Sequence, residues 1–399
     1  MAITDISKRR HERQMKKILK IVFRVSILII IAGTAAAVIL TKDLWYPRLG
    51  GILSSDSGEQ TETVLAAGEF PIIIPENKSL SVKLITDGFA MLTDTRLITY
   101  TSAGKVKLSS SHTFKNPVMN CSDDDIITYD LGGKKFSYFK KNKLGFTKET
   151  DRAILLGRVK NGYTAVVTES DKFLGDVFVY DANGNNIFNL NTTERLIDIM
   201  FNADCSGIYI TVLNSKSGDL TSQIMYYSLT EITKDENGNA LPLYQTEEYP
   251  TLSLQTAMFG DDKLILIGDR ETLVFDYQCR LISQLDYSLS LKTFDCGKNT
   301  AMLIFEDFSG KSVHFAALNA LDGKFLEFTS DFEIKDAVCT EDEQGEAVIF
   351  ILGENEIRQI NTLNTELRNL SLTTEFLNIM SNGKYIYLIG FEEINRITV

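Results

Sequence analysis

The chain has 399 residues, of which 44% are hydrophobic and 24% charged, a composition that excludes a largely disordered protein. The net charge of −12 is uneven, because residues 1–41 hold eight of the 41 basic side chains and only two of the 53 acidic ones. The remaining residues carry 33 basic and 51 acidic side chains, and their net charge of −18 argues against nucleic-acid binding.

The N-terminal segment is basic and is followed by an apolar run. Residues 1–20 carry seven Lys or Arg side chains, and in the apolar run 21–40 the only charged side chain is Arg24. A helix of 20 residues is about 30 Å long, which matches the hydrocarbon core of a bilayer. Trp45 and Tyr46 suit the interface on the far side. The sequence predicts a cytoplasmic segment over 1–20, a transmembrane signal-anchor helix over 21–40 and an extracytoplasmic remainder.

Two alternatives remain for the apolar run. Small residues at 35–37 would suit a cleaved signal peptide, and a buried core helix would need no basic flank. Residues 41–68 are rich in Gly, Ser and acids from Pro47 onward, which predicts a linker. The folded domain is therefore expected over 69–399.

Eight apolar, β-branched segments recur at intervals of about 40 residues, each preceded by Gly, Asp or Asn turn residues. They are Phe89–Thr93, Ile126–Tyr129, Tyr163–Val167, Ile208–Val212, Leu264–Gly268, Ala301–Phe305, Ala347–Ile351 and Tyr385–Ile389. Units of this length with about four short strands are typical of β-propeller blades. The fold class predicted is an all-β, eight-bladed propeller.

The last unit ends after its third strand, whereas the strand-like segment FPIIIP at Phe70–Pro75 precedes the first unit. Pairing this segment with the last blade would remove two open edges and close the ring. Seven blades with an accessory sheet are the alternative.

One repeat is lengthened by two polar insertions, at 214–223 and 233–242. We expect both to be loops, and loops on a rigid scaffold often carry binding residues. Tolerated insertions without a role are the alternative.

The five cysteines are odd in number and lack CxxC spacing, which indicates neither a zinc site nor a full disulfide framework. They are Cys121, Cys205, Cys279, Cys296 and Cys339. All except Cys279 are expected at the end of the first strand of a unit, too far apart to form disulfides.

No catalytic constellation is evident in the folded domain. His112 and His314 are its only histidines, and several units separate them. The turns Asp181–Asn185 and Asp235–Asn239 resemble the start of a calcium loop, but Thr192 and Thr246 stand where the final acidic ligand belongs, so Asx turns are favoured. No catalytic, cofactor or metal residue is predicted.

Three aspartates, Asp198, Asp295 and Asp336, lie on predicted first strands, which line the channel of a propeller. Acids facing one cavity could support glycan cleavage. Alternation along the strands could equally place them in a solvated channel without a role.

The segments KRRHERQMKK (8–17), VYDANGN (179–185) and VFDYQCR (274–280), together with the apolar run, carry a resemblance over the whole chain. The chain resembles uncharacterised single-pass membrane proteins of Firmicutes that have a WD-repeat-like or quinoprotein-like propeller outside the cytoplasm. Its blades lack the Trp-Asp pair, and Trp45 lies outside the domain.

The function expected is a membrane-anchored binding or scaffold module for an envelope protein or a cell-wall polymer, without catalysis or cofactor. The alternative is an envelope enzyme that acts on glycan through the channel carboxylates.

Overall fold

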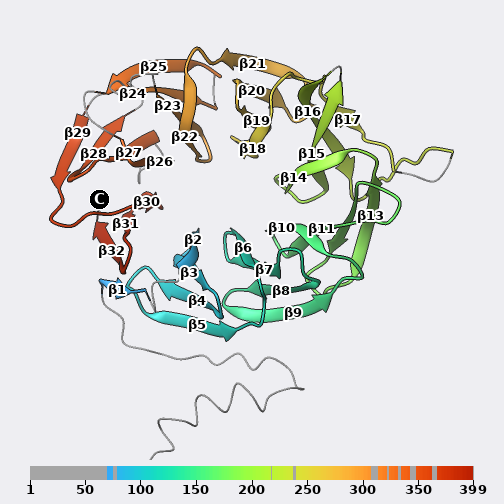
Figure 1. Ribbon diagram of the computed structural model, residues 1–399, viewed down its shortest axis with the longest axis horizontal. Helices are drawn as coiled ribbons and strands as arrows, with labels where there is room; N and C mark the ends of the chain where they lie inside the picture. The colour runs from blue at the N-terminus through green and yellow to red at the C-terminus, as the bar shows by residue number, and fades with distance from the viewer. Residues whose placement is uncertain are drawn as a thin grey trace, which may run out of the picture. The chain divides into compact units, whose positions relative to one another are not determined.

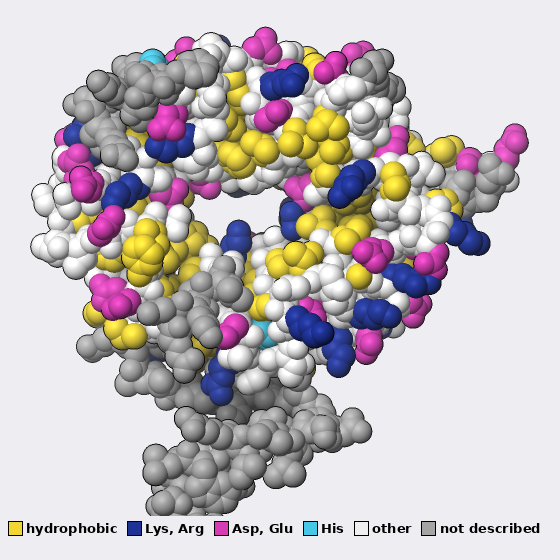
Figure 2. Space-filling view, viewed as in Figure 1, with side chains coloured by type: hydrophobic (Ala, Val, Ile, Leu, Met, Phe, Trp, Pro, Cys, Tyr) yellow, Lys and Arg dark blue, Asp and Glu magenta, His cyan; other side chains and the backbone are white. Residues whose placement is uncertain are grey.

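A computed structural model describes residues 70–74, 79–216, 218–236, 240–306, 313–320, 323–330, 334–341, 347–361 and 366–398. All belong to the compact unit Gln60–Val399. The described residues form eight antiparallel sheets of four strands around a central opening (Figure 1). The eight-bladed, all-β propeller is confirmed, and the seven-bladed alternative is wrong. Figure 2 shows the opening, with hydrophobic side chains along parts of its rim.

The blades are numbered along the chain, and the innermost strand of each begins the blade. Blade 1 contains β2 (Ser79–Ile85), β3 (Gly88–Thr93), β4 (Arg96–Thr101) and β5 (Val106–Ser111), and blade 2 contains β6 (Pro117–Ser122), β7 (Asp125–Asp130), β8 (Lys135–Lys140) and β9 (Lys143–Glu149). Blade 3 contains β10 (Ile154–Lys160), β11 (Tyr163–Thr168), β12 (Gly175–Tyr180) and β13 (Asn186–Thr192). Blade 4 contains β14 (Arg195–Phe201), β15 (Gly207–Lys216), β16 (Asp219–Ser228) and β17 (Tyr244–Gln245).

The second half of the ring follows the same order. Blade 5 contains β18 (Ser253–Phe259), β19 (Lys263–Gly268), β20 (Glu271–Asp276) and β21 (Leu281–Asp286), and blade 6 contains β22 (Ser290–Cys296), β23 (Thr300–Glu306), β24 (Val313–Asn319) and β25 (Phe325–Ser330). Blade 7 contains β26 (Asp336–Glu341), β27 (Ala347–Leu352), β28 (Glu356–Asn361) and β29 (Glu366–Ser371). Blade 8 contains β30 (Asn378–Ser381), β31 (Tyr385–Ile389), β32 (Glu393–Thr398) and the N-terminal β1 (Ile72–Ile73).

The segments predicted at 1–20, 21–40 and 41–68 lie outside the described residues. In the part of the chain that is described, no helix is long and apolar enough to cross a membrane.

The second strand of each blade is the most apolar because both of its faces are covered by neighbouring blades. All six residues of β3 are buried, and so are all but the first residue of β19 and of β27. A strand buried on both faces needs a continuous apolar run rather than alternation. This is why these eight segments stand out in the sequence.

The core is divided into eight hydrophobic clusters in the described residues, one at each interface between consecutive blades. The cluster between blades 5 and 6, for example, includes Ile265, Leu303 and Phe305. Each blade therefore depends on both neighbours to cover its two faces.

The ring closes where the two ends of the domain meet. Strand β1 pairs antiparallel with β32, with Ile72 opposite Ile394, and the Ile74 amide donates to the Glu392 carbonyl at 2.8 Å. Phe70 and Ile72 join the cluster between blades 8 and 1. The last blade thus obtains its fourth strand from the N-terminal side of the domain.

The side chain of Arg396 stabilises this closure. The Arg396 guanidinium lies 5.0 Å from the centre of the Phe70 ring and 4.6 Å from that of Tyr385. It also donates a hydrogen bond to the Ser102 carbonyl in blade 1. Arg396 therefore joins the N-terminal segment, blade 8 and blade 1.

The first polar insertion is not the loop that the sequence predicts. Residues 214–216 and 219–223 extend the β15–β16 hairpin, with Lys216 opposite Asp219. Gly218 at the tip has a φ of 94°, which allows the two strands to turn directly into each other. The described residues of the second insertion, 233–236 and 240–242, lie outside regular strands, apart from one bridge between Lys234 and Ala240.

Replacement of Arg396 tests the closure. Arg396→Met should lower the free energy of unfolding by about 1–3 kcal/mol, because it removes two cation–π contacts and a hydrogen bond from a charged donor. Urea denaturation of the full chain measures the effect. Arg368→Met, on an exposed residue of β29, is the control and should change stability by less than about 0.5 kcal/mol. Equal effects would contradict the role of Arg396.

Candidate functional site

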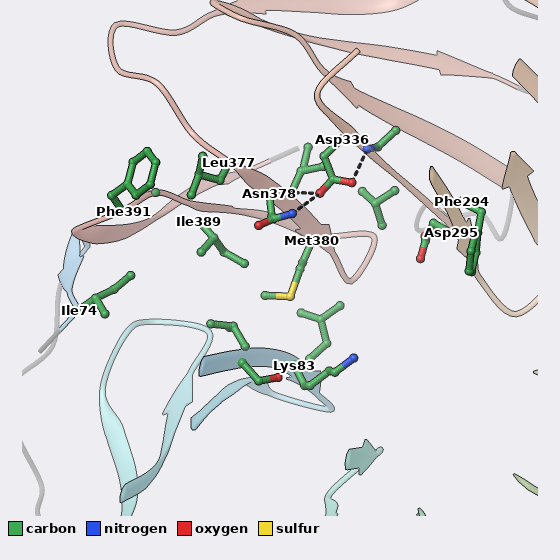
Figure 3. A pocket seen from close by; sticks show the side chains of 17 residues that line it. Ile74, Lys83, Phe294, Asp295, Asp336, Leu377, Asn378, Met380, Ile389 and Phe391 are labelled. Carbon is green, nitrogen blue, oxygen red and sulfur yellow. Dashed lines mark hydrogen bonds between the residues drawn. The ribbon is translucent and has the colours of Figure 1, made fainter. Parts of the chain in front are cut away.

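The three channel aspartates lie on innermost strands, in blades 4, 6 and 7. Asp336 accepts hydrogen bonds from the Ile379 amide at 3.0 Å and from the Asn378 side chain at 3.2 Å, both on β30 of the next blade (Figure 3). Its other carboxylate oxygen accepts from the Ala337 amide at 2.9 Å. Asp336 therefore links blade 7 to blade 8.

The other two aspartates repeat this arrangement. Asp295 accepts a hydrogen bond from the Cys339 amide of blade 7 at 2.9 Å. Asp198 faces the Thr256 amide of blade 5 at 3.4 Å and pairs with Arg158 of blade 3 at 2.6 Å. An innermost strand has a free edge whose amides need acceptors, and a carboxylate from the preceding blade supplies one. All three aspartates thus have a structural role.

Two of the three aspartates share a cavity, which we call the seam cavity. Its volume is about 630 Å³, and it is lined by residues 81–84 of β2, 294–295 of β22, 336–338 of β26, 377–380 of β30, residues 389–391 and Ile74 (Figure 3). Asp295 and Asp336 line it, and Asp198 does not. The structure therefore does not assemble the three acids into one site.

The seam cavity combines acidic and apolar walls. Burial raises the pKa of both carboxyls, Asp295 and Asp336, above the usual value for aspartate. Lys83 is the only cationic side chain among the described residues that line the cavity. Phe391 is 70% exposed at the rim, and Leu377, which also lines the cavity, is 37% exposed. The cavity can therefore bind a group that carries positive charge next to apolar surface.

Sequence reasoning missed Lys83, Asn378 and Phe391. Lys83 stands in an ordinary alternating strand, and Phe391 lies in the short connection between β31 and β32. Nothing in their local pattern distinguishes them from other surface residues. Only the meeting of blades 8 and 1 brings them to one cavity.

The two histidines lie apart from this cavity. His112 stacks on Phe114, its Nε2 is 3.1 Å from the Thr93 carbonyl oxygen, and burial lowers the pKa of its ring. His314 lies in β24 beside a small cavity of about 60 Å³. Neither histidine lines the seam cavity.

The first calcium-like turn is an Asx turn. The Asp181 carboxylate accepts hydrogen bonds from the Asn183 and Asn185 amides and from the Asn185 side chain. The second such turn includes 237–239, outside the described residues. Within the described residues no cluster of three or more His, Cys, Asp or Glu side chains could hold a metal ion.

All five cysteines are free thiols. Cys205 lies in the turn after β14, with a φ of 59°, and not at the end of a first strand as expected. Burial raises the pKa of the Cys121 thiol to about 12, and it raises the pKa of Cys205 and Cys339 as well. These thiols are therefore unreactive packing residues.

The ring of four-stranded, WD40-like repeats with a central channel defines a β-propeller. Residues 74–399 match the family of unknown function DUF5711, and the chain belongs to this family. A comparison with curated proteins finds no match.

Several solved structures share the fold. BamB from Moraxella catarrhalis is 12% identical, with 84% of this chain and 100% of BamB covered and a TM-score of 0.54. Sqt1 from Saccharomyces cerevisiae is 10% identical, with 84% and 100% covered and a TM-score of 0.55. Apo AztD from Citrobacter koseri is 12% identical, with 80% and 94% covered and a TM-score of 0.50. At these identities the likeness establishes the propeller fold alone.

One buried acid outside the cavity gives a pH test of the structure. Glu271 in blade 5 is 5% exposed, and its Oε1 has no hydrogen-bond partner, whereas its Oε2 accepts from Gln284 at 2.8 Å. Burial raises the pKa of Glu271, and the nearby acids Asp286 and Asp269 raise it further. Ionisation of this group therefore destabilises the folded protein.

Glu271→Gln should raise the midpoint of denaturation at pH 7. Because the folded-state pKa lies above the unfolded value, the cost of ionisation grows as pH rises from the unfolded pKa and vanishes below it. The gain of the variant should therefore shrink as pH falls through the raised folded-state pKa of Glu271 and should be lost at about pH 4. Thermal denaturation across this range measures it, and a gain independent of pH would contradict the assignment.

Proposed function

We propose that the protein is a membrane-anchored, extracytoplasmic binding module whose propeller holds a segment of an envelope protein or cell-wall polymer without turnover. The seam cavity supports the binding role, because it places an exposed aromatic ring and an acidic wall at one opening. Residues 1–40 support the anchoring role, because a basic segment precedes 20 nearly uncharged residues.

Photo-crosslinking in cells tests this function. A photoreactive phenylalanine analogue in place of Phe391 should yield one discrete adduct that is recovered with the membrane fraction. The matched control places the analogue at Tyr277, which is 50% exposed in the turn between β20 and β21, away from the cavity. Identical adducts from both positions, or none from position 391, would count against the proposal.

A second candidate function is glycan cleavage, because Asp295 and Asp336 line one cavity. Their backbone hydrogen bonds give both carboxylates a structural use, which favours binding without turnover. We expect the full chain to release no reducing ends from purified cell-wall glycan. Release that disappears in Asp295→Asn but persists in Asp198→Asn would establish the enzyme instead, since both variants remove the charge from a carboxylate that links two blades.

A further inference from the structure

The seam cavity lies where the first and last blades meet, and residues of blades 6 and 7, including Asp295 and Asp336, complete its wall. Strand β2 packs against β6 and β30 packs against β26, and the cavity lies between β2 and β30 (Figure 3). Residues 81–84 line one side and residues 377–380 the other. Four consecutive strand residues span about 13 Å. The slot therefore matches an extended chain of about four residues.

Both walls are terminal strands of their sheets. Strand β2 pairs only with β3, and β30 pairs only with β31. Each therefore has an edge without a neighbouring strand, where backbone groups can bond to an added extended segment. One amide of β30, that of Ile379, is already bound to Asp336. These open edges favour a polypeptide over a compact small molecule.

The charges of the cavity favour a cationic side chain. The Asp295 and Asp336 carboxylates accept hydrogen bonds from amides, but neither has an ion pair with a described residue. Lys83 stands on the opposite wall, also without an ion pair among the described residues. Residues 42–399 carry a net charge of −18, which attracts a basic partner at long range. One positive charge in the slot, together with that of Lys83, would balance the two half-buried carboxylates.

Apolar side chains flank the acidic wall. Ile74, Leu377, Ile389 and Met380 line the cavity, and Phe391 stands exposed at its rim. An aliphatic stem or an apolar neighbour of the cationic residue can cover these groups, and the Phe391 ring can also contact the cation.

We propose that the seam cavity binds an extended peptide segment of about four residues that carries one Lys or Arg between apolar residues. This inference rests on the proposed binding function and names its partner class. The cationic side chain lies against Asp295 and Asp336, its apolar neighbours cover Leu377 and Phe391, and Lys83 repels any second cation.

Peptides that differ only in charge test this assignment. The probes are the fluorescently labelled, acetylated and amidated peptides Gly-Leu-Lys-Leu-Gly and Gly-Leu-Glu-Leu-Gly, titrated with the full chain by fluorescence anisotropy. The Lys peptide should bind at least about tenfold more tightly, which corresponds to about 1.4 kcal/mol. Its affinity should fall as salt is added.

Four variants define the site. Asp336→Asn and Phe391→Ser should each weaken binding of the Lys peptide, and Lys83→Met should strengthen it. Asp198→Asn is the matched control, because it removes the charge from an equivalent link between blades outside the cavity and should leave binding unchanged. Urea denaturation of each variant separates loss of binding from loss of folding.

Equal affinity for both peptides, or weaker binding in Lys83→Met, would overturn the assignment of a cationic segment. Absence of binding by either peptide would overturn it as well. A discrete adduct from position 391 under those conditions would leave the proposed binding function standing with a different partner class.

Discussion

The closure of the ring is the constraint on which the rest of the structure depends. Each four-stranded sheet has two apolar faces and covers neither by itself, so stability comes from the clusters between consecutive blades. Seven of the eight interfaces form between blades that are consecutive in the sequence. The eighth requires the N-terminal strand to cross to the last blade, where Phe70, Ile72 and Ile394 complete the cluster with blade 1.

The seam cavity lies at this closure. Strand β2 packs beside β6 and β26 packs beside β30, whereas residues of β30 and β2 line opposite sides of the cavity. The aspartates that link successive blades fit this picture, since Asp336 binds the amide edge of β30 on one side of the slot. A carboxylate needed to hold blades together thereby becomes part of an acidic wall. The carboxylates that link the blades thus also line the proposed binding site.

The sequence predicts the fold well and the site poorly, for physical reasons. Strands buried on both faces must be continuously apolar, so segments such as Phe89–Thr93 are visible without coordinates. The placement of Asp295 and Asp336 on channel strands follows from the order of strands within a repeat. The hydrogen-bond partners of these aspartates cannot be predicted in this way, because Cys339 and Ile379 are more than 40 positions away and belong to the next blade. The insertion at 214–223 is polar, and a polar composition predicts a loop, but most of these residues pair in a regular hairpin.

Amide hydrogen exchange of the full chain tests ring closure most directly. Ile72→Asp places a charge in the buried cluster between blades 8 and 1, whereas Ile73→Asp changes a neighbour that is 66% exposed. The account predicts that only Ile72→Asp speeds exchange in β3, β31 and β32, and that β19 on the other side of the ring stays protected. Unchanged protection in Ile72→Asp, or equal effects of the two variants, would contradict closure by the N-terminal strand.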